Sequence, residues 1–223
     1  MMQNEKNLNL DTTMPVACRH GVQDKHPTVL SDIYQSEINV AIWQRMLPAT
    51  LQNSIKTFLA LNPAFQTKMI LKPQDALSRV SESFNYNMTE VSEDIAKLVD
   101  MFCYLFELKE AAMRLKVLDQ AMCPKFHVDR VPCRLVTTYQ SIASEWLPHE
   151  VIDHTKLGWG SNGLSDSESG LYQSKSDIQQ LGCGDVALFK GTLWDGSENT
   201  ALVHRSPVVP ANEKRLILTL DFN

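Results

Sequence analysis

The chain lacks the features by which nucleic-acid-binding and membrane proteins are usually recognised from sequence. Its 223 residues include 21 Lys and Arg against 26 Asp and Glu, a net charge of −5, and no basic run interrupts this balance. A nucleic-acid partner is therefore not expected. No apolar run is long enough to cross a bilayer, so a membrane is not expected as a partner either.

The sequence also lacks a cysteine framework and a secretion signal. Its five cysteines are odd in number and irregularly spaced, at positions 18, 103, 123, 133 and 183. The first residues, Met-Met-Gln-Asn-Glu-Lys-Asn, are polar and contain no apolar signal core. We therefore expect a cytoplasmic protein with free thiols.

The first half of the chain is rich in helix patterns. Residues 1–28 are polar, carry two prolines and are expected to form an irregular N-terminal arm. Apolar residues at helical spacing predict helices over 49–60 and 90–106, and β-branched runs predict strands over 38–43 and 68–71.

The second half is predicted to form strands, because apolar residues there alternate or form short runs bounded by glycine and proline. Strands are predicted over 113–119, 134–139, 184–191, 202–204 and 214–222. Residues 140–180 form a long insertion, of the length typical of a lid, a binding segment or a disordered loop. An α+β fold follows, with helices packed against an antiparallel barrel or jelly roll.

The triplet His127-Val128-Asp129 is the main candidate for chemistry. Side chains two apart on an extended strand share a face, so the triplet presents an imidazole beside a carboxylate. Non-haem Fe(II) oxygenases bind their metal with two histidines and one carboxylate, and here the third ligand must come from elsewhere. The plainer interpretation is a histidine hydrogen-bonded by a neighbouring aspartate. A position between two prolines at a strand end favours a ligand at a barrel mouth.

Two later residues extend this candidate site. His204, within Leu-Val-His-Arg-Ser-Pro, is a suitable second histidine, or else a satisfied histidine at a strand–turn junction. Arg215 lies in the last predicted strand, on the face opposite its leucines. An arginine there is either solvated or holds a carboxylate bidentately inside the barrel.

The order of these segments over 110–223 resembles the double-stranded β-helix of Fe(II)/2-oxoglutarate dioxygenases. The matching features are H-x-D, then R-L-V-T-T-Y, G-D-V-A-L-F, a histidine, and an arginine eleven residues later. The resemblance implies that His127, Asp129 and His204 bind Fe(II). It further implies that Arg215 anchors 2-oxoglutarate and that Tyr139 faces this cosubstrate.

A second resemblance covers most of the chain. The segments Cys-Pro-x-Phe-His-x-Asp-x-Val-x-x-Arg-Leu, Glu-Trp-Leu, Leu-Val-His-Arg-Ser-Pro and Lys-Arg-Leu-Ile-Leu-Thr-Leu-Asp are similar to the bacterial domain-of-unknown-function 1826 family. It implies a single domain over 29–223. With the strand pattern and the first resemblance, the expected fold is a helical N-terminal half on an antiparallel double-stranded β-helix, a jelly-roll or cupin-like barrel with its core at about 110–223. The family name brings no assigned reaction.

Cys123 and Cys133 flank the H-x-D triplet and offer an alternative ligand set. Thiolates with imidazole suit Zn²⁺ in a tetrahedral site, provided that the segment bends sharply, for example at Pro124 and Pro132. Two buried free cysteines are the simpler interpretation.

The sequence therefore favours a metal-dependent oxygenase of the Fe(II)/2-oxoglutarate type. Its substrate, a small molecule or a protein, is not identified, and no oligomeric state is predicted. Many such enzymes carry a serine two residues after the anchoring arginine, whereas this position is Ile217 here. The identity of the cosubstrate is therefore left open. The alternative is a non-catalytic protein of metal homeostasis that binds Zn²⁺ or another metal.

Overall fold

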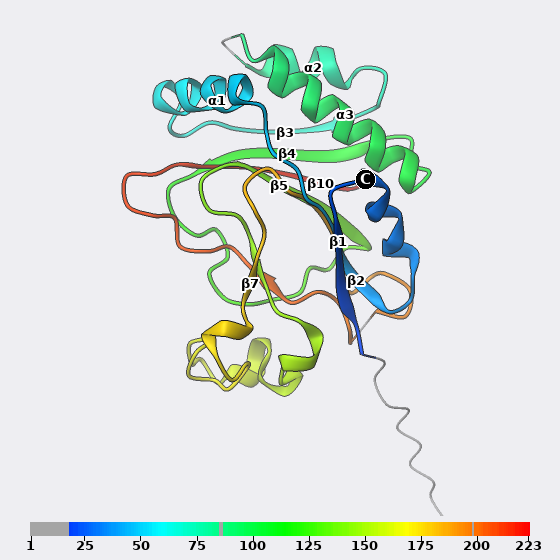
Figure 1. Cartoon of the computed structure of the whole chain (residues 1–223), viewed down its shortest axis with the longest axis vertical. Helices are drawn as coiled ribbons and strands as arrows, with labels where there is room; N and C mark the ends of the chain where they lie inside the picture. Colours follow the sequence, from blue (N-terminus) through cyan, green and yellow to red (C-terminus); the bar gives the residue numbers. More distant parts are fainter. Residues whose placement is uncertain (1–17, 85–86, 198) are drawn as a thin grey trace, which may run out of the picture.

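The computed structural model describes residues 18–84, 87–197 and 199–223. Within these ranges the first half carries the 3₁₀ helix η1 and the α-helices α1 to α3, and both halves contribute strands (Figure 1). The helices span Pro27–Tyr34 (η1), Ala49–Leu61 (α1), Ala76–Ser83 (α2) and Thr89–Leu105 (α3). The predicted α+β class is confirmed.

A seven-stranded sheet forms the centre of the molecule, in the order β1-β2-β8-β5-β10-β4-β3. Its neighbours pair antiparallel, except for the parallel pair β1–β2. The strands span His20–Asp24 (β1), Ile38–Trp43 (β2), Gln66–Leu71 (β3), Ala111–Leu118 (β4), Cys133–Gln140 (β5), Val186–Lys190 (β8) and Arg215–Phe222 (β10).

A smaller sheet has the order β7-β6-β9, with Gln179–Gln180 (β7), Glu145–Trp146 (β6) and His204–Arg205 (β9). One apolar cluster joins residues from both sheets. From the large sheet it takes Val136, Phe189 and Ile217, and from the smaller sheet or its flanks Ala143 and Leu202. The inner face of the large sheet therefore packs toward the smaller sheet.

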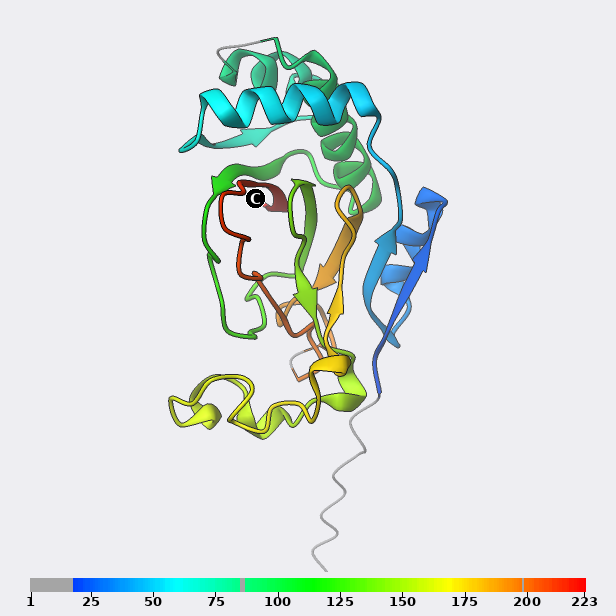
Figure 2. The ribbon, with the colours of Figure 1, turned by 60° about the vertical axis from the view of Figure 1, so that its left-hand side comes forward.

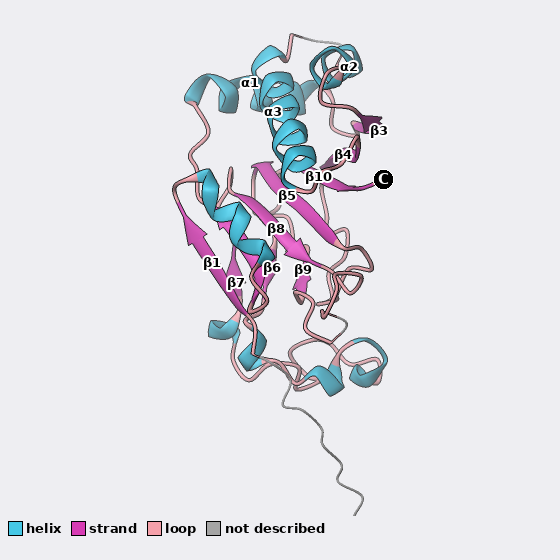
Figure 3. Ribbon diagram, turned by 90° about the vertical axis from the view of Figure 1, so that its right-hand side faces the viewer, coloured by secondary structure: helices cyan, strands magenta, loops and turns pink. Residues whose placement is uncertain are grey.

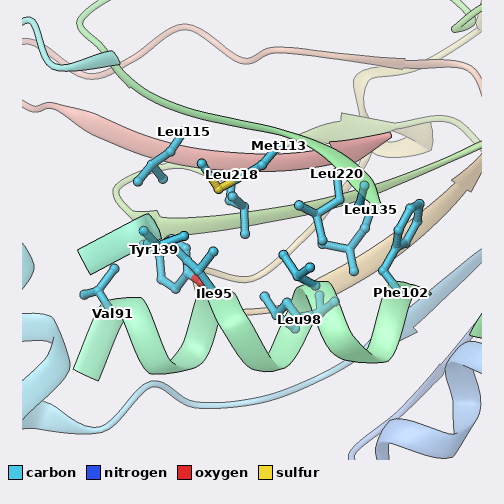
Figure 4. Packing of buried hydrophobic residues seen from close by; sticks show 14 of the residues in the cluster. Val91, Ile95, Leu98, Phe102, Met113, Leu115, Leu135, Tyr139, Leu218 and Leu220 are labelled. Carbon is cyan, nitrogen blue, oxygen red and sulfur yellow. The ribbon is translucent and has the colours of Figure 1, made fainter. Parts of the chain in front are cut away.

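The helices cover the other face of the large sheet. Buried α3 side chains pack on alternate residues of β4, β5 and β10 (Figure 4). On β10 the leucines 216, 218 and 220 belong to this helix-side core, while Ile217 belongs to the inner cluster. The alternation expected from the sequence thus sets which face each residue occupies, and each fully buried leucine contributes about 1.5–3 kcal/mol.

The insertion after β5 is ordered by a third apolar cluster. It contains Phe126, Leu147, Leu171, Tyr172 and Val203, with further insertion residues packed against it. The short 3₁₀ turns of this insertion lie at the opposite end of the molecule from α1–α3 (Figure 2).

Several predicted boundaries change. The prediction that residues 1–28 are irregular is wrong for His20–Asp24, which form β1 beside β2, whereas residues 1–17 lie outside the described part. The first half combines its helices with β1–β3, of which β2 and β3 lie where strands were predicted (Figure 3). Helix α2 was not expected. None of the described helices is long and apolar enough to span a membrane.

Candidate metal centre

Two histidines are placed side by side by a short antiparallel contact. The amide of His127 donates to the carbonyl of His204 at 3.0 Å, and the amide of His204 donates back at 2.9 Å. Their neighbours Phe126 and Val203 face the insertion. Because side chains alternate along extended chain, both imidazoles turn to the inner side, with ring centroids 4.6 Å apart.

Asp129 reaches the same point from the segment that precedes β5. Its carbonyl accepts the amide of Thr192 at 2.9 Å. At Gly191 an added Cβ would lie 2.8 Å from that carbonyl, so only glycine permits this approach. The Asp129 carboxylate lies 3.2 Å from His204 Nε2 and 3.8 Å from His127 Nε2. One ligand atom from each of the three residues lies within 4.8 Å of the others.

The outer nitrogens of both rings are directed by backbone carbonyls. His127 Nδ1 lies 3.0 Å from the carbonyl of Lys125, and His204 Nδ1 lies 3.1 Å from that of Leu202. A carbonyl only accepts hydrogen bonds, so each Nδ1 carries a proton, and in the neutral form of the ring the Nε2 lone pair is directed inward. Two lone pairs and a carboxylate then converge, and this arrangement fits a cation at their centre.

Charge at the centre also favours a cation. Burial and the neighbouring His204 lower the pKa of His127, which keeps its imidazole available as a ligand. Burial would raise the pKa of Asp129, but the neighbouring His204 and Arg134 lower it to about 2. The side-chain exposure is 34% for His127 against 9% for His204, so the cluster is open beside His127.

Arg134 fixes the orientation of the Asp129 carboxylate. Its Nη1 donates to Asp129 Oδ2 at 2.7 Å, while Nε and Nη2 donate to the two oxygens of Asp221 at 2.7 and 3.0 Å. The two carboxylates and one guanidinium leave a net charge of −1 beside the two imidazoles. A divalent cation is the natural complement of this set.

Arg215 lies in the same cavity and is fully buried. The cavity has a volume of about 320 Å³ and is lined by the three candidate ligands together with Arg215. The guanidinium donates to the hydroxyls of Ser206 (2.7 Å), Ser144 (2.9 Å) and Thr138 (3.2 Å), and its Nε has no partner within the described residues. Burial lowers the pKa of Arg215 to about 10. A buried cation without a carboxylate partner is costly, so the cavity is suited to an anionic ligand.

Tyr139 is not in this cavity, so the prediction that it faces a cosubstrate is wrong. On β5 the inward positions are Arg134, Val136 and Thr138, and alternation turns Tyr139 to the helix side. There its hydroxyl donates to Asp94 at 2.7 Å, and burial raises its pKa well above the usual value.

The two cysteines proposed as alternative ligands are separated. Cys123 lines the cavity, but the group of converging ligand atoms does not include it. Cys133 is buried in the helix-side core, where burial raises the pKa of its thiol. A zinc site that uses both thiols is therefore not formed.

The sequence analysis did not identify several residues that shape the centre. Arg134 and Asp221 were noted only as members of strands, and Ser144, Ser206 and Gly191 were given no role. An arginine on the inner face of β5 and an aspartate on the inner face of β10 could in principle have indicated an ion pair, because charges on buried faces must be paired. Their partners become evident only once the strand register is known.

Two solved structures share the overall architecture of this chain. The chain is similar to the crystal structure of a rice dioxygenase for auxin oxidation, with 10% identity, a TM-score of 0.51, and coverage of 92% of this chain and 82% of that one. It is similar to the structure of JOX2 in complex with 2OG, Fe and JA, also with 10% identity and a TM-score of 0.51, covering 94% and 77%. At this identity the likeness defines the class of fold alone.

The chain belongs to the family described as "Protein of unknown function (DUF1826)", whose model matches residues 24–221. Among curated proteins there is no match.

Proposed function

We propose that this protein is an Fe(II)- and 2-oxoglutarate-dependent oxygenase. The observation that carries the proposal is Arg215, a fully buried cation without a carboxylate partner in the described chain. It shares one cavity with the converging His127, Asp129 and His204 side chains. A metal site alone needs no such arginine, whereas a cosubstrate with a second carboxylate does.

The arrangement of the two sheets supports the proposed oxygenase function. We infer that they close as a double-stranded β-helix, of the jelly-roll kind, with the cavity between them. The inner apolar cluster that joins both sheets and the similarity to oxygenase structures support this closure.

Each residue then has a defined task. His127, Asp129 and His204 would hold Fe(II). Bound iron with its cosubstrate would supply the oxidative chemistry. Arg215 would pair with the distal carboxylate of 2-oxoglutarate, Ser206 and Ser144 hold that guanidinium in place, and Arg134 keeps Asp129 directed at the metal.

The test measures metal and cosubstrate binding separately. Protein purified without chelator is expected to contain about one equivalent of a transition metal, lost in His204→Ala. Calorimetric titration of the Mn(II)-loaded protein with 2-oxoglutarate is expected to show binding that weakens at least about 30-fold in Arg215→Met, since losing one partner of a buried charge pair costs about 2–5 kcal/mol. Succinate formation with Fe(II) and O₂ is the activity readout.

The Arg215→Met variant is expected to remain folded, because it replaces an uncompensated buried charge with an apolar chain. Tyr139→Phe is the matched control, since it alters a buried polar group on the other face of the sheet and should leave 2-oxoglutarate affinity unchanged. Metal binding without any 2-oxoglutarate binding would contradict the oxygenase and favour the metal-homeostasis alternative with Zn²⁺.

A further inference from the structure

A second groove adjoins the metal cavity. It has a volume of about 140 Å³ and lies over β3, β4 and β10 on the face of the large sheet that carries the metal cavity, where Lys68 and Arg114 are exposed. Both spaces share the lining residues Arg114, Met122, Arg134, Ile217 and Thr219. A molecule that extends from the metal centre along this side therefore enters the groove.

The groove is lined by cations without partners. Lys68, Arg114 and Lys116 contribute to it, and no acidic residue is among its lining residues. Within the described part of the chain, none of the three makes an ion pair or a side-chain hydrogen bond, whereas Arg134 is neutralised by Asp129 and Asp221. This concentration of positive charge occurs in a chain whose net charge is −5.

The positions of Lys68, Arg114 and Lys116 on the sheet bring like charges together. In the β3–β4 register Lys68 lies directly opposite Arg114, and Lys116 is two residues farther along β4. Like charges directly opposite on one face destabilise a sheet. The arrangement therefore lowers stability unless an anion lies between them.

Protection of a sheet edge explains only part of this pattern. β3 is an edge strand, and lysines on such strands prevent pairing with other chains. This accounts for Lys68. It does not account for Arg114 and Lys116, because β4 is paired on both sides by β3 and β10.

We propose that the substrate of the metal centre is an organic acid or phosphate ester whose anionic group is bound by Lys68, Arg114 and Lys116. This inference rests on the proposed function. The groove has room for one acidic group rather than for a polymer. Met122 and Ile217, at the junction with the metal cavity, offer apolar contact to the carbon skeleton that joins the two ends of the substrate.

The test uses three small probes on protein loaded with Zn(II) and 2-oxoglutarate, so that the metal cavity is filled. Phenyl phosphate and phenylacetate are compared with uncharged phenylacetamide by ligand-observed NMR titration. The two anions are expected to bind at least tenfold more tightly than the amide, and their relative affinities distinguish a phosphate from a carboxylate preference. The double variant Lys68→Gln/Arg114→Gln is expected to lose this preference.

Lys56→Gln is the control, since it removes one positive charge from an exposed position on α1, across the sheet. Equal binding of all three probes, no binding of any of them, or an unchanged preference in the double variant would overturn the inference. If 2-oxoglutarate binds through Arg215 but the anions show no preference, only this inference fails. If 2-oxoglutarate does not bind while the preference depends on Lys68 and Arg114, the groove remains an anion site and the oxygenase proposal fails.

Discussion

Arg134 links the metal centre to the large sheet through two carboxylates. It donates one hydrogen bond to Asp129 and two to Asp221, and its side chain is only 17% exposed. Partners that orient a metal ligand typically account for a 10–100-fold effect on metal affinity. The residue is therefore expected to act through Asp129 rather than by touching the metal.

Arg134→Met is expected to weaken metal binding by about 10–100-fold, because the Asp129 carboxylate loses its orienting donor. It should also lower the free energy of unfolding by about 3–5 kcal/mol, since Asp221 is left buried and unpaired. Competition titration with a chromogenic chelator and urea unfolding measure the two effects.

The double variant Arg134→Met/Asp221→Leu separates these two roles. Removing both partners should restore most of the stability, because position 221 then no longer holds a buried, unpaired carboxylate. Metal affinity should stay low, since Asp129 still lacks its donor. Recovery of metal affinity together with stability would show that Arg134 supports the fold and not the ligand.

At the scale of the element, β5 presents different chemistry on its two faces. Thr138 faces the cavity, where its hydroxyl accepts a hydrogen bond from Arg215 at 3.2 Å. The next residue, Tyr139, donates to Asp94, which also pairs with Arg45. The two neighbours are therefore expected to respond oppositely to substitution.

Tyr139→Phe is expected to lower the free energy of unfolding by about 1.5–3 kcal/mol, the range for a hydrogen bond to a charged group, without changing 2-oxoglutarate affinity. Thr138→Val should cost less stability but weaken 2-oxoglutarate binding several-fold, because Arg215 loses one of its positioning acceptors. Urea unfolding and calorimetric titration, run on both variants, check the pair. A loss of cosubstrate affinity in Tyr139→Phe would contradict this division of faces.

The same strand explains what sequence could and could not predict. Alternation on β4 and β10 identified which residues share a face, and the structure keeps those groupings. The resemblance placed Tyr139 in the cavity, and alternation could not correct this because it does not say which face is inward; the neighbouring Thr138 lies there instead. The pairing of Arg134 with Asp221 depends on the β5–β10 register, which includes a bulge that no local pattern indicates.

Local patterns also failed where order depends on distant partners. β1 is a short polar segment that becomes a strand only because β2 pairs with it. By contrast, His127, Asp129 and His204 were grouped from their order and context, and the structure brings their ligand atoms within 4.8 Å of one another. The resemblance rather than spacing supplied that grouping, since no spacing rule links residues so far apart in sequence.

For the whole molecule, the metal centre is expected to stabilise one end more than the other. The candidate ligands join the segment before β5 to β9, and both pack against the insertion through Phe126 and Val203. The helices are held by a separate core on the far face of the large sheet. Local opening of the ligand end need not involve α1–α3.

Metal binding should therefore raise the free energy of unfolding according to mass action, by about 2.7 kcal/mol at a free metal concentration of 100 times Kd. Hydrogen exchange followed by mass spectrometry, with and without Zn(II), should show the largest gain in protection in peptides that contain the amides of His127, His204 and Leu147, whose backbone hydrogen bonds join the segments beside the metal centre. Peptides from α3 should gain less, because their local openings leave the ligands in place.

His204→Ala should abolish the gain, whereas His149→Ala, a histidine outside the converging group, should retain it. A uniform gain across the chain would mean that the ligand end and the helices open as one unit. The absence of any gain in the wild type would contradict the metal centre.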